Sequence, residues 1–316
     1  MKLGEIFDLG IEMAVQADPR GKKEVKRLLA QRKKSFSKLK KKEKEFFDEE
    51  KLKHLYDDSR IFTDKNAKIK RALVGIDMET PELLLAKELS RSGKKIDLVW
   101  AHHPEDYALK NLDGVMSLQE YVLEKGGLPP NVTEKILSKR IEKVANSLHS
   151  INANRVGSAA RLLNISFMNT HTITDNLVYD FLDKLIKKKK PSTLGDLVEM
   201  LEEIPEYKEA KKIGQGPKII SGSKASRCGK IIPAGMTGGT EGAKEIYERL
   251  SISGVGTVVD MHMSNEHLKQ AKKNYVNVII AGHMASDSLG MNLLLDKVEK
   301  KGVEIIPHSG LIRVKR

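Results

Sequence analysis

The sequence is poor in cysteine and lacks any long hydrophobic run. Cys228 is the only cysteine among 316 residues, which excludes an internal disulfide framework and fits a reducing compartment. No apolar stretch approaches the roughly 18 to 20 residues that cross a membrane, and the N-terminus lacks the residue order of a signal peptide. We therefore expect a cytoplasmic protein without a membrane partner. With 40% apolar residues, the chain can bury a full core.

Several catalytic motifs are also missing. No Gly-x-Ser-x-Gly string is present, so the sequence does not support a serine hydrolase. The glycine-rich string 235–240 resembles a phosphate nest but lacks the Gly-Lys-Ser/Thr ending of a P-loop. Cys228 follows Arg227, which is slight ground for a nucleophile. These motifs therefore assign no catalytic residue.

Positive charge is concentrated in one segment. The net charge is +13, and residues 20–44 hold 13 lysines and arginines against Glu24 and Glu43, a local balance of +11 that leaves +2 elsewhere. Such a run can bind the phosphates of a nucleic acid by releasing counterions. It is also typical of a solvated helix face, because the acidic residues within 43–50 would pair with it. We favour the second interpretation, since charge runs are common on exposed helices.

Hydrophobic periodicity predicts a helical N-terminal region. Apolar residues recur at helical spacing from Leu3 to Val15, and the string 18–21 interrupts the pattern. Helical spacing returns from about 22 to 56 with only an intermittent apolar stripe. Because that stripe is too thin to form a core, we expect a basic helical arm that packs on the body or on a neighbouring subunit.

The rest of the chain contains two similar strand–helix–strand units. The first has a strand at 72–76, a helix that begins at Thr80 and a strand at 96–100. The same order returns with a strand at 230–234, a helix from about 240 to 250 and a strand at 256–260. We interpret this as a weak internal duplication, although units of this length are common.

Helical stretches lie between the two units, at 117–125, 132–150, 155–162 and 175–186, followed by a helix to 203 that Ser192 or Thr193 caps. The predicted fold class is α/β, with two similar α/β lobes, a site between them and an N-terminal helical arm. The predicted domains are a basic arm at 1–69, a first lobe with helical insertions at 70–220 and a second lobe at 221–316.

Three histidine-bearing strings follow predicted strands, at the carboxyl edge where open α/β sheets place ligands. They contain His102 and His103 in string 101–104, His171 and Asp175 in string 171–175, and His283 and Asp287 in string 282–287. In the second and third strings, a separation of four puts both side chains on one face if a helix begins at the histidine. One such string alone is usually a capping or surface arrangement, but three at strand ends predict a metal site.

Imidazole and carboxylate without thiolate suit divalent ions such as zinc, iron, manganese or nickel. At a strand tip, the side chains of His102 and His103 point in opposite directions, so each can coordinate a different ion. Two ions held by about five protein ligands leave positions open for water and substrate, as catalysis requires. The residues therefore predict a catalytic type of metal site.

As a set, the strings 97–104, 171–175 and 280–287 resemble the three signatures of the Ngg-interacting-factor-three family, whose members are also known as type-2 GTP cyclohydrolase I. The match spans about residues 70–316 in the family's order. The resemblance implies a two-lobed α/β body, a dinuclear metal centre between the lobes and a toroidal homo-hexamer. It implies that the ligands are His102, His103, Asp175, His283 and Asp287, with His171 beside them as a supporting residue.

The sequence departs from the family pattern in two places. The last acidic ligand of the family is usually glutamate, whereas here it is Asp287, which is one methylene shorter. The family's Trp-Asp-Asn opening is absent, and the basic arm replaces it. His262 also follows a predicted strand of the second lobe, so we expect it, or Glu266, to join or support the site. A helix start capped by Ser264 is an equally good interpretation of that string. His308 is left without a role.

Two functions from different classes stay open. The first is a metal-dependent hydrolase that acts on a small nucleotide or phosphoester, GTP cyclohydrolase-like by resemblance, in which paired ions activate water and Asp175 or His171 moves protons. The second is a metal-bearing regulatory or nucleic-acid-associated assembly protein without turnover, which exposes residues 20–44 to a polyanion. Neither the substrate nor the identity of the metal follows from the sequence.

Overall fold

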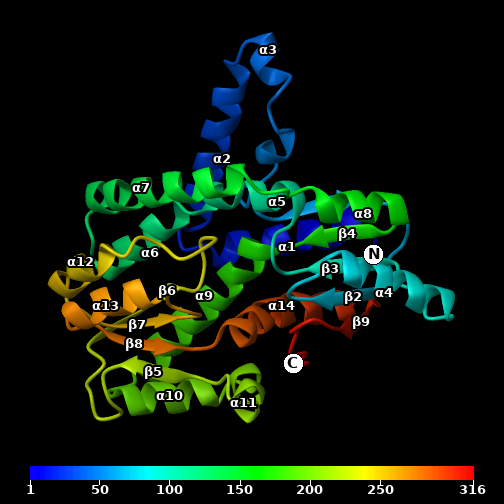
Figure 1. The fold of residues 1–316 in the computed structure, drawn as a ribbon. Coiled ribbons are helices and arrows are strands. Elements are labelled where there is room, and N and C mark those ends of the chain that lie inside the picture. The colour runs from blue at the N-terminus through cyan, green and yellow to red at the C-terminus, as the bar shows by residue number, and fades with distance from the viewer.

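The computed structural model, which describes residues 1–316, contains two separate β-sheets with helices between and around them (Figure 1). In the first sheet the strand order is β1 (Arg60–Thr63), β4 (Ser166–Asn169), β3 (Leu98–Ala101), β2 (Arg71–Gly75) and β9 (Glu304–Pro307). β1 runs antiparallel to β4, and the other neighbours are parallel. Because β3 and β4 are parallel and in register, their carboxyl ends meet at one edge.

The second sheet has the order β5 (Lys218–Ser221), β8 (Asn277–Ile280), β7 (Val255–Asp260) and β6 (Lys230–Gly235). β5 is antiparallel to β8, whereas β8, β7 and β6 are parallel. β6, α12 (Ile246–Ile252) and β7 repeat the order of β2, α4 (Thr80–Arg91) and β3. The predicted α/β fold with two lobes is confirmed.

Two helices join the lobes, and a third packs on them. α9 (His171–Lys189) follows β4 of the first sheet, α14 (His283–Glu299) follows β8 of the second, and the two pack against each other. Gly290 makes the close approach feasible, since a Cβ there would lie 2.4 Å from the carbonyl oxygen of Thr174. α1 (Leu3–Ala17) packs on both helices, so the first sheet and these helices share one apolar core (Figure 1).

The remaining helices cover the outside of the molecule. α4 and α8 (Arg155–Leu163) contact each other beside the first sheet, and the second lobe carries α10 (Leu194–Glu202), α11 (Pro205–Lys212) and α13 (Asn265–Lys273). A further row of helices reaches from one sheet to the other: α5 (Asp106–Lys110) contacts β1, α6 (Leu118–Gly126) contacts β6, and η2 (Leu112–Val115) and α7 (Pro130–His149) pack beside them. The predicted N-cap Thr193 accepts a hydrogen bond from the Asp196 amide at the start of α10. None of the helices combines the length and the apolar composition needed to cross a bilayer.

The chain organisation differs from the predicted domain ranges in three places. α1 does not belong to an arm, because Leu3 and Ile6 are fully buried against the body. β1 and β5 extend the sheets of the lobes that follow them in the chain. β9 leaves the second lobe and completes the first sheet, where Ile305 pairs with Ala72 of β2. Only α2 (Lys22–Ser37), α3 (Lys41–Lys44) and η1 (Glu49–Leu52) project as an arm (Figure 1).

The helix expected at about 240–250 begins later, at Ile246. Residues 236–242 form a loop instead, because Gly238 and Gly239 have φ angles of 94° and 86°, which a helix does not accept. The Gln119 amide nitrogen donates to the carbonyl oxygens of Gly238 and Thr240, at 2.7 Å each. This anchor from α6 holds the loop at the end of β6.

Candidate metal centre

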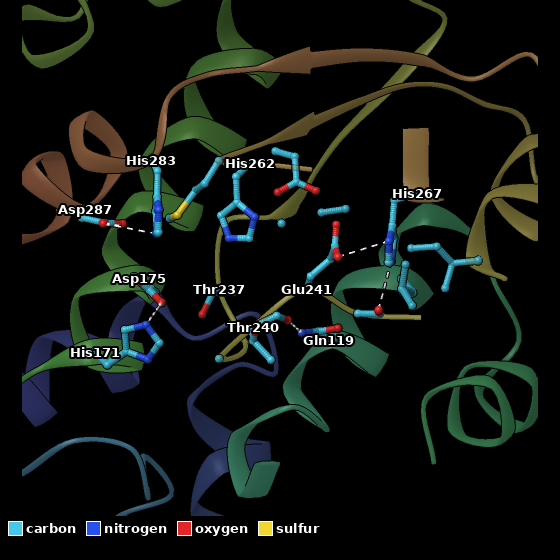
Figure 2. A pocket seen from close by; sticks show the side chains of 18 of the residues that line it. Gln119, His171, Asp175, Thr237, Thr240, Glu241, His262, His267, His283 and Asp287 are labelled. Carbon is cyan, nitrogen blue, oxygen red and sulfur yellow. Dashed lines mark hydrogen bonds and ion pairs between the residues drawn. The ribbon is translucent and has the colours of Figure 1, made fainter. Parts of the chain in front are cut away.

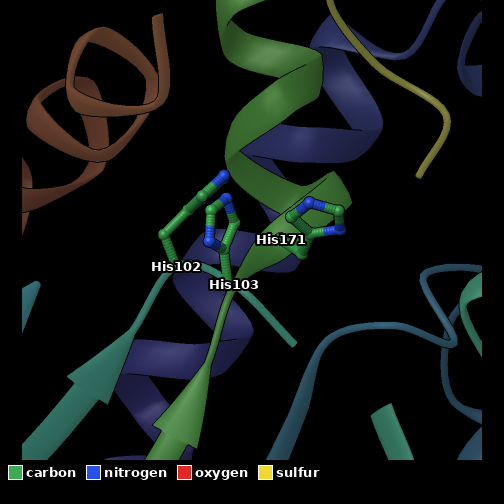
Figure 3. Close-up of side chains that lie close together, drawn as sticks. All are labelled: His102, His103 and His171. Carbon is green, nitrogen blue, oxygen red and sulfur yellow. The ribbon is translucent and has the colours of Figure 1, made fainter. Parts of the chain in front are cut away.

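The three histidine strings meet at one place, because the strands before them end there. His102 and His103 directly follow β3, and His171 starts α9 just after β4. Figure 3 shows their three imidazoles together at these strand ends. From the second lobe, His283 starts α14 after β8, and its ring centroid lies 5.2 Å from that of His103. Helices begin at His171 and at His283, so the condition for placing each histidine and its aspartate on one helix face is met, and the first of these helices starts four residues before the predicted 175–186.

Two carboxylates from these helices lie among the imidazoles. Nε2 of His102 is 3.4 Å from Oδ1 of Asp175 and 3.5 Å from Oδ1 of Asp287. Oδ2 of Asp287 is 3.5 Å from Nε2 of His103 and 3.5 Å from Nε2 of His283. The two oxygens of Asp287 therefore face different histidines, which is the arrangement of a carboxylate that can bridge two ions.

The donor set fits divalent ions. Four ligand-type atoms are buried without any hydrogen-bond partner: Nε2 of His102, Oδ1 of Asp175 and both carboxylate oxygens of Asp287. Each buried polar atom left unpaired costs about 1–3 kcal/mol, so an ion that joins them offsets a real penalty. Around a tetrahedral ion with bonds of about 2.1 Å, ligand atoms lie about 3.4 Å apart, close to the separations found here. The buried histidine–aspartate cluster can thus bind metal.

Hydrogen bonds to the far side of the rings point Nε2 toward the cluster. The Thr174 hydroxyl donates to the carbonyl oxygen of Thr170 at 2.6 Å, so it accepts from Nδ1–H of His102 at 3.0 Å. Nδ1 of His103 lies 2.7 Å from a carboxylate oxygen of Asp77 and donates to it. Such partners fix the imidazole tautomer and leave the Nε2 lone pair for a metal.

His171 is held in the same way by Asp58, whose Oδ2 lies 2.7 Å from Nδ1 of the ring and also accepts from the Thr172 hydroxyl at 2.6 Å. Its Nε2 lies 3.8 Å from Oδ2 of Asp175. The ligand atoms of His171, His102 and His103 lie within 4.8 Å of one another. His171 therefore faces the cluster directly, and Asp58 stands in the supporting position.

Burial and neighbouring charges set the protonation of the metal-free cluster. Burial lowers the pKa of His102 to about 4 and raises the pKa of Asp175 to about 8. Burial also opposes charge on His103, but the carboxylates of Asp287 and Asp77 outweigh it and raise the pKa of His103 to about 10. The pKa of Asp287 is held well below its usual range, because the neighbouring imidazoles outweigh its burial. Metal binding must therefore displace protons from this cluster.

The other residues considered from the sequence lie in different surroundings. The exposed His262 stands beside His283, with ring centroids 4.7 Å apart. Glu266 points away and pairs with Lys244, while Ser264 caps α13, as the alternative interpretation predicted. The exposed His308 follows β9 and lies in none of the metal-compatible clusters.

Cys228 is buried, and burial raises the pKa of its thiol to about 11. A thiol with so high a pKa is almost wholly protonated near neutral pH, and the thiolate is the reactive form. The structure therefore gives no support to a cysteine nucleophile.

The cluster opens into a pocket at the carboxyl ends of β6 and β7, shown in Figure 2. His262, Glu241 and the loop around Thr240 line the part beyond His283, and no lysine or arginine lines the pocket. Burial raises the pKa of Asp260 in this wall to about 7, and its carboxylate forms no ion pair. The pocket thus has the candidate metal ligands at one end and the carboxyl groups of Glu241 and Asp260 in the wall beyond them.

The fold and the cluster define a two-lobed α/β protein with a candidate metal site between its lobes. Among solved structures, the chain is similar to a NIF3 superfamily protein from Sphaerobacter thermophilus, at 23% identity and a TM-score of 0.75, over 98% of this chain and 99% of that one. The resemblance predicted from the three strings is therefore confirmed, at the level of the fold.

Weaker similarities extend to reduced HcgD from Methanocaldococcus jannaschii and to a Bacillus cereus protein related to NIF3. The first has 12% identity and a TM-score of 0.47 over 79% of this chain and 87% of that one. The second has 11% identity and a TM-score of 0.43 over 98% and 96%. No protein-family model matches the sequence, and neither does any curated protein.

Proposed function

We propose that the protein is a dinuclear metal-dependent hydrolase that acts on a small nucleotide or phosphoester. The observation that carries this proposal is the bridging position of Asp287, whose two buried, unpaired oxygens face His102 on one side and His103 with His283 on the other. A closed structural site would use up its ligand positions, whereas this cluster opens into a pocket.

In this proposal, His102, Asp175 and Asp287 would hold one ion, and His103, His283 and Asp287 would hold the other. His171 completes the cluster from the side of Asp175. Zinc, iron, manganese and nickel all suit imidazole and carboxylate ligands. A bound pair of such ions would lower the pKa of water to near neutral and polarise a phosphoryl or ring-carbon electrophile.

The protein's own side chains would keep the metal-binding imidazoles oriented and would transfer protons. The hydrogen bonds from His102, His103 and His171 to their partners keep the rings from turning. His262 is exposed to the pocket beside His283 and its ring makes no hydrogen bond to the protein, so its nitrogens are free to take up or deliver a proton.

A cationic groove next to the pocket supports a substrate that carries phosphate. Lys135, Lys139 and Lys143 lie one helical turn apart on α7 and line a groove. That groove and the metal pocket share a wall made of Glu241, Gly242 and His267. Because the pocket itself has no lysine or arginine, we propose that an anionic tail would reach the lysines of this adjoining groove.

The test is turnover by protein loaded in turn with each of the four metals, with GTP and bis-p-nitrophenyl phosphate as substrates. Asp175→Asn should retain the fold and lose at least about 100-fold in rate, since it loses a charged ligand. The matched control is Asp180→Asn on the same helix, an outward-facing residue paired with Lys184, which should keep the rate. Wild-type protein that holds two ions and turns over neither substrate would contradict the hydrolase proposal.

The resemblance also predicts a homo-hexamer. Light scattering coupled to size-exclusion chromatography should then give about six times the 35.3 kDa chain mass. A monomer or dimer would contradict that part of the proposal and leave the site geometry within one chain unchanged.

A further inference from the structure

A lysine-rich hairpin projects from the body and takes no part in the metal centre. It consists of α2, α3 and η1, residues 22–52, and rises above the helices that cover the molecule (Figure 1). Val25 is the only buried residue of α2, and α3 has none. We call these residues the basic hairpin.

The arginines and lysines of residues 20–44 differ in whether they form ion pairs. All three arginines pair with carboxylates: Arg20 with Asp18, Arg27 with Glu24 and Arg32 with Asp57, at 2.7–2.8 Å. The ten lysines form no ion pair, and nine of them are exposed. The lysines are Lys22, Lys23, Lys26, Lys33, Lys34, Lys38, Lys40, Lys41, Lys42 and Lys44.

The acidic residues after the run do not neutralise it. Asp48 pairs with Arg60 of β1, and Glu50 pairs with Lys53. The Glu43 side chain accepts a hydrogen bond from the backbone amide of Lys40, and so caps α3. The expectation that acidic residues in 43–50 pair with the run is therefore wrong, because three of these carboxylates bind outside it or at the backbone, and Glu45 and Glu49 form no ion pair. The physical reason to regard the run as a neutralised helix face is removed.

On α2 the lysines share one side of the helix. Lys22, Lys26 and Lys33 are separated by four and seven residues, which places them nearly in line along the axis. Val25 and Leu29 lie on the adjoining side of the helix, about 20–60° around the axis from Lys22, and are not exposed. The result is a straight row of unpaired cations along a helix of 16 residues, about 24 Å long.

The tip of the hairpin adds one exposed aromatic ring. Phe46 is 89% exposed, whereas Phe36 and Phe47 pack against each other with tilted rings whose centroids lie 4.8 Å apart. Nζ of Lys44 lies 5.3 Å from the centroid of the Phe36 ring. The tip is thus held by its own contacts and presents Phe46 to solvent.

We propose that the basic hairpin binds single-stranded nucleic acid without sequence preference. A row of cations that follows a phosphate backbone, with an aromatic ring on which a base can stack, is the arrangement used for this ligand. Binding to a lipid surface requires an exposed apolar helix face, and none of the large apolar residues of α2 is exposed. The proposal is independent of the hydrolase and holds whether or not the metal centre turns over substrate.

The experiment measures fluorescence anisotropy of a labelled single strand of about 20 nucleotides with full-length protein across a series of salt concentrations. The variant replaces Lys22, Lys26, Lys33 and Lys34 by Gln. The control replaces four lysines that sit in ion pairs, Lys184, Lys187, Lys189 and Lys211, by Gln, so that the net charge falls equally. Circular dichroism and metal content should match wild type in both.

For the hairpin variant, the slope of log K against log salt should become less negative by roughly 3, because four phosphate contacts are lost at about 0.7 each. The control should keep the wild-type slope. Phe46→Ala should weaken binding about tenfold without changing the slope. Equal losses in both lysine variants would overturn the proposal, since net charge alone would then explain binding. So would binding to phosphatidylserine vesicles but not to the strand, or a hairpin variant that dissociates the oligomer.

Discussion

Replacing Asp287 by asparagine removes the carboxylate that faces both halves of the cluster and keeps the size of the side chain. Its oxygens lie 3.5 Å from Nε2 of His102, His103 and His283, and the side chain is 1% exposed. Nothing else in the cluster can replace it, because the second carboxylate, Asp175, contacts only the His102 and His171 side. We expect Asp287→Asn to lower the affinity for both ions.

The magnitude follows from the geometry. Two opposite unit charges 3.5 Å apart attract each other by about 5 kcal/mol at an effective dielectric constant of 20, and an ion bonded to Asp287 would lie closer and carry two charges, so its attraction to the carboxylate would be larger. The neutral amide oxygen still coordinates weakly, and removing a buried charge also removes its desolvation cost. A net loss of about 3 kcal/mol per ion remains, or roughly two orders of magnitude in affinity.

The assay is metal content per chain after dialysis, measured by elemental analysis, together with titration of the metal-free protein. The matched control is Asp260→Asn, the same chemical change in the wall of the same pocket, whose carboxylate faces none of the clustered imidazoles. Wild type and control should hold two ions, and Asp287→Asn fewer than one. If Asp287→Asn retained both ions at wild-type affinity, the bridging role of this residue would be refuted.

Three further predictions concern stability and support of the site. Gly290→Ala should destabilise the protein by about 1–3 kcal/mol in thermal or urea denaturation, because its Cβ would meet the α9 backbone at 2.4 Å. The control Gly4→Ala, whose Cβ would have nothing within 4 Å, should stabilise α1 by about 1 kcal/mol. Similar effects of the two substitutions would contradict the close packing of α9 and α14. In metal-free protein, the pKa of Asp260, raised by burial to about 7, means that the native state binds an extra proton between about pH 4 and pH 7, so wild type loses stability as pH rises through that window. Asp260→Asn should therefore be as stable as wild type near pH 4 and more stable at pH 7.5, by at most about 4 kcal/mol in urea denaturation, and a constant difference would rule out this titration. Asp58→Asn should lower metal affinity by about 10–100-fold in a competition titration, because His171 loses the partner that fixes its ring, and an unchanged affinity would show that His171 needs no support.

The cluster could be predicted from the sequence because strand ends and helix starts are local features. Apolar runs marked β3, β4 and β8, and the spacing of four in His171–Asp175 and His283–Asp287 placed both side chains on one face once a helix began at each histidine. Asp77 could have been found by the same rule, since it follows β2 closely at the same edge. Asp58 had no such signal, because it lies in an irregular segment 113 residues from its partner His171.

Contacts between segments far apart in the sequence could not be predicted from local patterns. The periodicity of α1 predicts a helix, but the same pattern suits a helix packed in an arm or in the body. β9 reads as a strand of the second lobe by position, yet its apolar residues pair with β2 of the first. Charge counted along the chain likewise suggested pairing within the basic run, whereas Asp48 is drawn to Arg60 by the fold.

The central claim is tested most directly by diffraction from crystals of metal-loaded protein, with anomalous data collected at the absorption edge of the metal. The account predicts two peaks about 3.5–4 Å apart, one bonded to His102 and Asp175, the other to His103 and His283, with Asp287 between them. A single peak, or peaks away from these five side chains, would contradict it.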